Sequence, residues 1–336
     1  MSDKLKQNHL DFIDFIKGFA TISVILLHTL PHRVLYDTFA VYHIWQAVPI
    51  FLFITFYLGF RNLEKKPFNF RDYYTLDRIK KIFLKLWLPL IILAFFEAIF
   101  FMFCGTNDKA MGSLLCYNNG PGSYYIWLYM QIWLLLPLIY TLLKKTGIIL
   151  GGCLLMILGH IGDFCIETYF GITPKFLCFR YIFMSVPALM YLRRVNNKGT
   201  TFLAIISIVY LYSMHYSEVP ILIDPILPNG WEAQTSLGFF YTLCLFVLLK
   251  KCYAKIKNTH FANCISNIGH ISWEVFLVQM VLLGSGIVEY TSARLFVSPV
   301  LQVCYKVLIV LFSSLFFAKL YKRVLLAILK RIGWHA

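Results

Sequence analysis

Residues 11–33 read DFIDFIKGFATISVILLHTLPHR. From residue 11 to residue 30 the stretch is mostly apolar, and about 20 such residues cross the hydrocarbon layer of a bilayer as one helix. Three polar side chains interrupt it, those of Asp14, Lys17 and His28. Because polar groups are costly in lipid and usually face the protein interior, this helix indicates both a membrane protein and the residues to consider first for its chemistry.

The rest of the chain continues this pattern. Of its 336 residues, 59% are apolar and only 14% are charged, which is far from the composition of a water-soluble domain. The apolar runs are continuous rather than alternating, which favours helices over a β-barrel. The sequence therefore predicts an all-α polytopic integral membrane protein with about ten transmembrane helices, at residues 11–30, 44–60, 79–103, 123–143, 147–163, 176–192, 200–214, 233–249, 271–288 and 299–320.

The net charge of +15 encodes topology. A nucleic-acid partner would require one basic patch, but the basic residues instead gather in alternate connections between the apolar runs. The basic clusters lie at residues 4–17, 61–85, 144–145, 193–198, 250–257 and 319–331. This positive-inside pattern places both termini in the cytoplasm and leaves no patch for nucleic acid.

No connection is long enough to form a core of its own, so we expect a single transmembrane domain over residues 1–336. Residues 61–77 mix basic side chains with Phe and Tyr, which predicts a cytoplasmic interfacial segment. Residues 321–336 are expected to form a cytoplasmic tail. The outer connection at 215–231 contains three prolines and should be irregular.

The nine cysteines show no spacing typical of a metal or redox site. Cys104 and Cys116 could both lie in an outer loop. They either pair there or remain two separate thiols.

Lys17 and His28 are 11 residues apart, about three helical turns, so their side chains share one face about 16 Å apart along the axis. With the N-terminus inside, Lys17 lies at the cytoplasmic mouth and His28 lies toward the outer leaflet. This suits a donor whose anionic phosphates stay in the cytoplasm while a long thin arm reaches a buried base. Acyl-coenzyme A has this shape, and a histidine can take the proton of an acceptor hydroxyl as the hydroxyl attacks the thioester.

Two other interpretations of His28 are open. The imidazole could simply hydrogen-bond a neighbouring helix, and spacing alone weighs that interpretation equally with the catalytic one. His28 and His32 also have the i, i+4 spacing of metal ligands. Pro31 between them should end the helix and no third ligand is evident, so we predict no metal.

The run Asp14-x-x-Lys17-Gly18 followed by His28 resembles the first helix of the acyltransferase 3 family of membrane-bound O-acyltransferases. Four later segments are similar to segments of that family in the same order. They are VPIFLFITFYLGF at 48–60, LDRIKKIFLKLWLPL at 76–90, GPGSYYIWLYMQIWLLLPLI at 120–139 and IGHISWEVFLVQM at 268–280.

Three features depart from the family pattern. Lys17 stands where Arg is commoner, which keeps the charge but loses the bidentate geometry toward a phosphate. Thr55 and Phe56 replace a Ser-Gly pair, so a hydroxyl remains while the Phe ring fills space between helices. Gln279 replaces a histidine and cannot exchange a proton, so catalysis must not depend on that position.

The resemblance implies transfer of an acyl group, commonly acetyl, from acetyl-CoA to a hydroxyl of a cell-surface glycan or lipid-linked sugar. It also implies the bacterial cytoplasmic membrane as the location, and we expect no appended soluble domain. On this view His28 is the general base or relays the acyl group. Lys17, Arg78 and Lys81 would bind the phosphates of the donor.

Further polar residues in the apolar runs are candidates for supporting roles, in addition to Asp14 and Thr55. Glu97 could orient His28 or pair with Arg180, or it could lie solvated near the outer interface. Arg180 could bind an anionic acceptor or the acyl oxygen, or it could snorkel to the interface.

A transporter or flippase of a glycan or lipid precursor is the alternative from another class, with its polar helix faces lining a pathway. Inverted repeats and broken helices in corresponding halves would indicate it, and neither is clear in the sequence. A catalytically idle scaffold is a third possibility, which Phe56 and Gln279 favour. The sequence leaves the acceptor and the oligomeric state open.

Overall fold

The computed structural model describes residues 2–65, 69–104, 106–114, 120–171, 176–195, 198–216 and 232–331. Every regular element within these ranges is a helix, so the all-α prediction is confirmed for the described residues. The helices form two compact units. The first comprises Met1–Val34, Tyr74–Ser123 and Thr259–Ala336, and the second comprises Leu35–Tyr73 and Tyr124–Asn258, with α2 (His32–Asp37) crossing the boundary.

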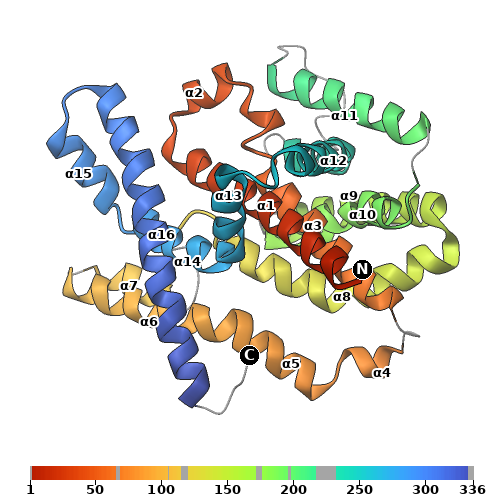
Figure 1. Ribbon diagram of the computed structural model, residues 1–336, viewed down its shortest axis with the longest axis horizontal. Coiled ribbons are helices and arrows are strands. Elements are labelled where there is room, and N and C mark those ends of the chain that lie inside the picture. The colour runs from red at the N-terminus through yellow and green to blue at the C-terminus, as the bar shows by residue number, and fades with distance from the viewer. Residues whose placement is uncertain are drawn as a thin grey trace. The chain divides into compact units, whose positions relative to one another are not determined.

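The first unit is built around α1 and the C-terminal helices (Figure 1). Its elements are α1 (Ser2–Thr29), α5 (Leu76–Ile82), the π-helical turn η2 (Phe83–Trp87), α6 (Leu88–Phe103), α7 (Asn107–Leu114), α13 (His260–His270), α14 (Ser272–Gly284), α15 (Ile287–Leu295) and α16 (Pro299–Arg331). Its core joins α1, α14, α15 and α16 through a cluster of buried aliphatic side chains that includes Ile25, Val275, Val278 and Val310.

The second unit contains the middle of the chain. Its elements are η1 (Ala40–Tyr42), α3 (Ala47–Glu64), α4 (Phe70–Tyr73), α8 (Tyr124–Thr146), α9 (Ile148–Phe170), η4 (Cys178–Met184), α10 (Ser185–Leu192), α11 (Lys198–Tyr216), η5 (Glu232–Gln234), η6 (Ser236–Gly238) and α12 (Phe239–Ile256). Aromatic rings hold α3, α10 and α12 together, with Phe53 packed on Phe246 at a centroid distance of 4.4 Å and on Tyr191 at 5.9 Å.

Among the described residues, seven helical stretches are long and apolar enough to cross a membrane. They are 11–29, 40–64, 70–103, 124–146, 148–170, 236–256 and 299–331. Helices α13 and α14 make an eighth if they count as one span, although they are bent by 72°. The chain is thus a multi-pass membrane protein with seven or eight such helices in its described part, where the apolar runs predicted ten.

Three of the ten predicted runs do not form straight spans, and each has a local structural reason. The run at 176–192 is divided between the 3-10 helix η4 and the short helix α10. The run at 200–214 forms α11, which is long enough but not apolar enough to pass as a span. The run at 271–288 forms α14, which is the second half of the bent pair.

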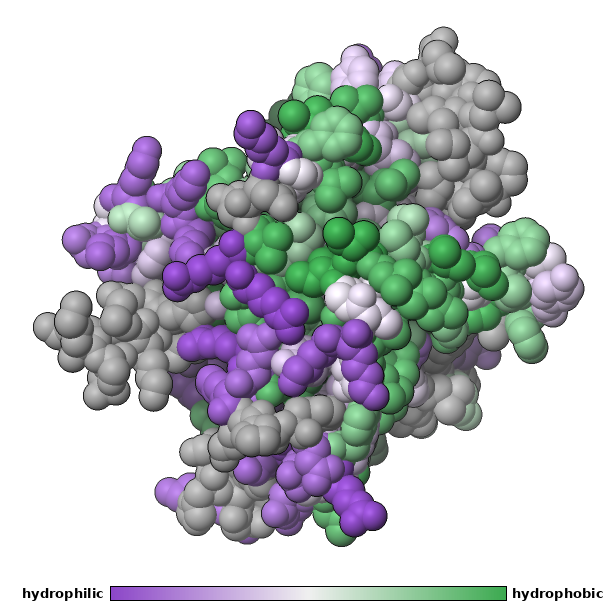
Figure 2. Space-filling view, turned by 90° about the vertical axis from the view of Figure 1, so that its right-hand side faces the viewer, coloured by the Kyte–Doolittle hydropathy of each residue, from purple (hydrophilic) through white to green (hydrophobic). Residues whose placement is uncertain are grey.

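The surface agrees with a lipid environment. Large hydrophobic side chains are exposed along several helices, and Figure 2 shows them covering wide areas of one face beside gathered hydrophilic side chains. On α16, Phe312 and Phe316 are more than half exposed. Contiguous exposed apolar surface of this kind would be unfavourable in water and suits contact with acyl chains.

The segments predicted between and after the spans are partly helical. Within 61–77, α3 continues to Glu64, α4 is a single short turn and α5 begins at Leu76, while residues 66–68 lie outside the described ranges. The predicted tail begins as helix, because α16 runs on to Arg331. Most of the predicted outer loop at 215–231 lies outside the described residues, as does Cys116, so the Cys104 pairing is not described.

Candidate functional site

The site in the first unit is organised by a close crossing of α1 and α13. A Cβ atom at Gly18 would overlap the carbonyl oxygen of Ile265, and one at Gly269 would overlap the carbonyl oxygen of Asp14. The two backbones are therefore in direct contact. No residue with a side chain fits at either glycine unless the helices separate.

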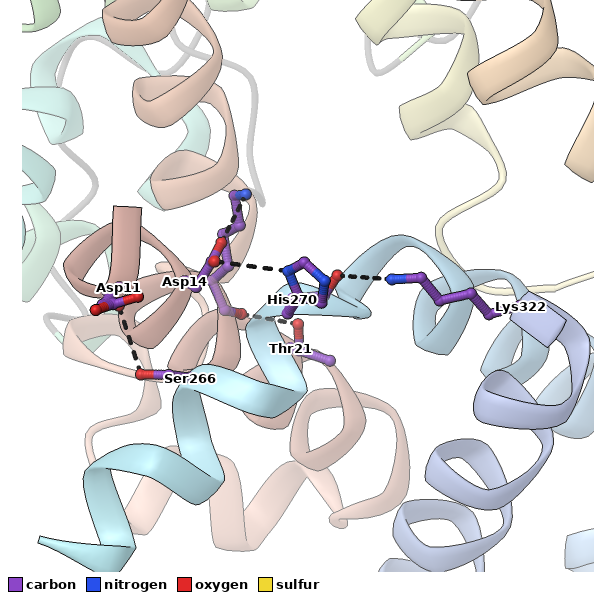
Figure 3. A network of polar contacts seen from close by, with 7 residues as sticks. Asp11, Asp14, Thr21, Ser266, His270 and Lys322 are labelled. Carbon is purple, nitrogen blue, oxygen red and sulfur yellow. Dashed lines mark hydrogen bonds and ion pairs between the residues drawn. The ribbon is translucent and has the colours of Figure 1, made fainter. Parts of the chain in front are cut away.

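This crossing brings the end of α13 to the charged residues of α1 (Figure 3). Lys17 Nζ donates a hydrogen bond to Asp14 Oδ1 at 3.1 Å, and His270 Nδ1 lies 3.8 Å from Asp14 Oδ2. Asp14 thus lies between two nitrogen groups from different helices, and it offsets the charge of Lys17 in a position that is only partly exposed.

A lysine of α16 joins the same network, although the sequence analysis treated its cluster only as a topology signal. Lys322 Nζ donates to the backbone carbonyl of His270 at 3.5 Å and lies 3.9 Å from Glu274 Oε1. The cationic groups of Lys17 and Lys322 therefore both lie beside the bend between α13 and α14. The sequence contained no signal for this, because the two lysines are more than 300 positions apart.

His28 lies in the last turn of α1, which ends at Thr29 ahead of Pro31. Its side chain is partly buried, and its imidazole has no hydrogen-bond partner among the described residues. A histidine that serves only to join two helices would have such a partner. The observation therefore favours the chemical interpretation of His28 over the structural one.

A second polar group in this unit has no partner either. Gln279 of α14 is 0% exposed, and neither its amide nitrogen nor its amide oxygen has a hydrogen-bond partner among the described residues. It follows Val275 and Val278, which share a hydrophobic cluster with Ile25 of α1. A buried amide without partners lowers stability, and such groups are typical of sites that bind a ligand.

The effect of Gln279 can be measured directly. We expect Gln279→Leu to raise the melting temperature of the purified protein by several degrees, because it removes an unsatisfied group worth about 1–3 kcal/mol. Gln46→Leu is the matched control, since Gln46 is equally buried but donates to Val41 O at 2.9 Å and accepts from Thr242 Oγ1 at 2.8 Å. That control should lower the melting temperature. Destabilisation by both variants would contradict the account of Gln279.

The other predicted donor-binding residues of this unit lie on α5. Arg78 and Lys81 are both exposed. The π-helical turn that follows α5 precedes Pro89, whose ring would clash with the carbonyl four residues earlier in a regular helix. Tyr321 of α16 donates a hydrogen bond to Pro89 O, and Leu84 packs with the C-terminal part of α16. The turn therefore fixes α5 against the helix that carries Lys322.

Glu97 is buried in α6 of the first unit, at 8% exposure. Thr55 belongs to the second unit, where its hydroxyl donates to the carbonyl of Phe51 at 2.8 Å within α3. Such a back-bond is common for threonine in apolar helices and leaves the hydroxyl oxygen able to accept.

Arg180 also belongs to the second unit, and its partner is Asp163 of α9, which the sequence analysis did not single out. Gly159 and Gly162 allow η4 to approach α9 closely, since a Cβ at Gly159 would lie 2.7 Å from Phe179 O. As a result, Arg180 Nε donates to Asp163 Oδ2 at 3.0 Å. An acidic residue inside an apolar run was the signal that could have indicated this pair.

The family model of the acyltransferase domain matches residues 10–319 of the 336-residue chain. The chain belongs to the acyltransferase 3 family. No curated protein and no solved structure matches it. Membership indicates an acyltransferase that acts within the membrane. The matched range includes every candidate residue predicted from the sequence, whereas Lys322 lies three residues beyond its end.

Within the described part of this acyltransferase 3 protein, no group of three His, Cys, Asp or Glu residues could hold a metal ion. The polar side chains described above for the first unit are those of the Asp14–Lys17 pair, His28, Glu97 and Gln279, together with the cations Arg78, Lys81 and Lys322. They offer a cation near the middle of α1, at Lys17, and a potential base in its last turn, at His28.

Proposed function

We propose that this protein transfers an acyl group, most simply acetyl, from acyl-CoA to a hydroxyl of a cell-surface glycan or lipid-linked sugar in the bacterial cytoplasmic membrane. The observation that supports it best is α1 itself. One helix carries a cation at Lys17 and, three turns later, an imidazole with no partner among the described residues. Family membership adds the reaction class.

In the proposed mechanism, His28 acts as the general base that accepts the proton of the acceptor hydroxyl. As His28 takes this proton, the hydroxyl oxygen attacks the carbonyl carbon of the thioester, the carbon–sulfur bond breaks and the thiolate of coenzyme A leaves. The proton then passes from the imidazolium to the thiolate, so that the base is restored. A neutral imidazole is required at the start, and the absence of a carboxylate partner among the described residues favours it.

Donor binding is assigned to the part of α1 around Lys17, three turns before His28. Lys17, together with Arg78 and Lys81 of α5, supplies positive charge for the phosphates of coenzyme A. Lys322 adds a fourth cation to this set, because it lies at the α13–α14 bend beside the Asp14–Lys17 pair. The positive-inside pattern of the sequence predicts that all four residues lie on the cytoplasmic side, where acyl-CoA is made.

Binding of acetyl-CoA tests this function against the transporter alternative. We expect acetyl-CoA to raise the melting temperature of the protein in lipid nanodiscs, since a ligand stabilises the form that binds it. Lys17→Gln should weaken the affinity about tenfold, which is the loss of about 1.4 kcal/mol expected for one charge-assisted contact. Lys145→Gln, at the end of α8, should leave the affinity unchanged. A melting temperature that ignores acetyl-CoA at millimolar concentration would contradict the proposal.

The acceptor can be identified by an experiment in cells. Surface polymers from strains with and without the gene should differ by one acyl group on a sugar, which mass spectrometry would detect. An identical set of polymers would exclude a surface glycan as the acceptor.

A further inference from the structure

A second polar cluster lies entirely within the second unit, where α9, η4 and η6 meet. It consists of His160 and Asp163 from α9, Arg180 from η4 and Ser236 from η6. Asp163, Arg180 and Ser236 are at least nine-tenths buried, with exposures of 6%, 8% and 5%. Together they line a cavity of about 10 Å³.

The ion pair in this cluster leaves one oxygen without a donor. Asp163 Oδ2 accepts from Arg180 Nε at 3.0 Å, whereas Oδ1 is buried and has no hydrogen-bond partner among the described residues. A buried carboxylate oxygen that lacks a donor is unfavourable, because its desolvation is not offset by a hydrogen bond. The cavity beside it is therefore suited to a molecule that brings a hydrogen-bond donor.

The charges restrict the class of that molecule. Arg180 already offsets the charge of Asp163, so a cation gains little, and the open carboxylate oxygen repels an anion. A neutral hydroxyl remains as the group that can donate to Asp163. The pairing thus disfavours the anionic acceptor that the sequence suggested for Arg180.

The other side of the cavity can receive such a hydroxyl as well. His160 Nε2 lies 3.0 Å from Ser236 Oγ, and both groups can donate as well as accept. One hydroxyl could therefore donate to Asp163 and accept from Ser236. The cavity volume of about 10 Å³ is close to what a single water-sized oxygen needs.

Apolar side chains surround the polar groups. Leu155 and Met156 of α9 and Phe179 and Phe183 of η4 are its apolar lining, and Gly159 and Thr235 also border the cavity. Apolar walls beside a few fixed polar groups are typical of small-molecule sites, and here the space between them takes one oxygen-sized group.

We propose that this cluster is an acceptor subsite, which binds one hydroxyl of a neutral sugar between Asp163 Oδ1 and Ser236 Oγ. The inference rests on the proposed function for its acceptor class. A site with buried polar groups rejects analogues that lack the matching hydroxyl much more strongly than an apolar pocket does. The subsite would therefore select for a sugar with a hydroxyl at the matching position, and it lies on the half of α9 that the charge pattern predicts to be toward the outer leaflet.

Site-specific photocrosslinking in the source cells tests the subsite. Met156→p-benzoylphenylalanine places the photoreactive group at the cavity, one turn before His160. Leu158→p-benzoylphenylalanine is the control, since Leu158 is on the same helix, 51% exposed and outside the cavity lining. We expect mass spectrometry to find a sugar-bearing adduct at position 156 and only phospholipid adducts at position 158.

Two second-site changes make the test specific. Asp163→Asn and, separately, Ser236→Ala should each lower the yield of the sugar adduct about tenfold. Ser236→Ala leaves the Asp163–Arg180 pair intact, so it remains informative if Asp163→Asn does not fold. Phospholipid adducts alone at position 156, no adduct there, or a sugar adduct that neither change affects would each overturn the subsite, and the cavity would then hold water only.

Acetyl-CoA stabilisation of the same protein separates the two proposals. A sugar adduct without stabilisation by acetyl-CoA would support a sugar-binding site at this cluster but contradict acyl transfer. Stabilisation without a sugar adduct would support donor binding and contradict the subsite.

Discussion

Replacing His28 with alanine should abolish acyl transfer while the protein remains folded. General-base catalysis contributes about 10²–10⁴-fold to a rate, so the transfer of labelled acetyl from acetyl-CoA should fall by at least two orders of magnitude. Folding should persist because the imidazole has no hydrogen-bond partner among the described residues that the variant would leave unsatisfied. The melting temperature in detergent should shift by only a few degrees.

His32→Ala provides the matched control. His32 is exposed at the start of α2, four residues after His28, and it lies beyond the end of α1. Its loss should leave the transfer rate unchanged. If His28→Ala retains full activity, or if both variants lose activity equally, His28 is not the base.

Substituting alanine for Gly269 should have the largest effect on stability. The new Cβ would overlap the carbonyl oxygen of Asp14, which belongs to the backbone of α1 and cannot move without the helix. Overpacking of this kind destabilises by about 3 kcal/mol or more. We expect a strongly reduced yield of folded protein and a broad, early thermal transition.

Asn267→Ala tests whether the effect belongs to the crossing or to α13 in general. Asn267 lies two residues earlier on the same helix and is exposed. Alanine is the better helix former, so this variant should be at least as stable as the parent protein. A Gly269→Ala protein with an unchanged melting temperature would show that α1 and α13 are not in direct contact.

The sequence predicted much of the helical architecture because few backbone structures are stable in lipid. Residues 11–29, 124–146 and 148–170 were recognisable as spans, since a helix must satisfy its own backbone groups in hydrocarbon. Hydropathy alone could not reveal the break at Ile271. A bent pair and a straight span have the same composition, so only tertiary packing distinguishes them.

The sequence could predict those site residues that are polar or charged within an otherwise apolar run. Lys17 and His28 were evident because they interrupt an apolar helix. The contacts of Lys322 and the pairing of Arg180 with Asp163 were not, because each depends on the approach of segments that are distant in sequence. The glycines that permit those approaches have no side chain to signal their role.

Helix α16 has 33 residues and is therefore about 50 Å long, while the hydrocarbon layer is about 30 Å thick. A helix of this length adapts to a thinner or thicker bilayer by tilting. Lys322 is carried on this helix, so a change of tilt would move its ammonium group relative to the carbonyl of His270. A bilayer thickness that changes this tilt would thereby also change the electrostatics around Asp14 and Lys17.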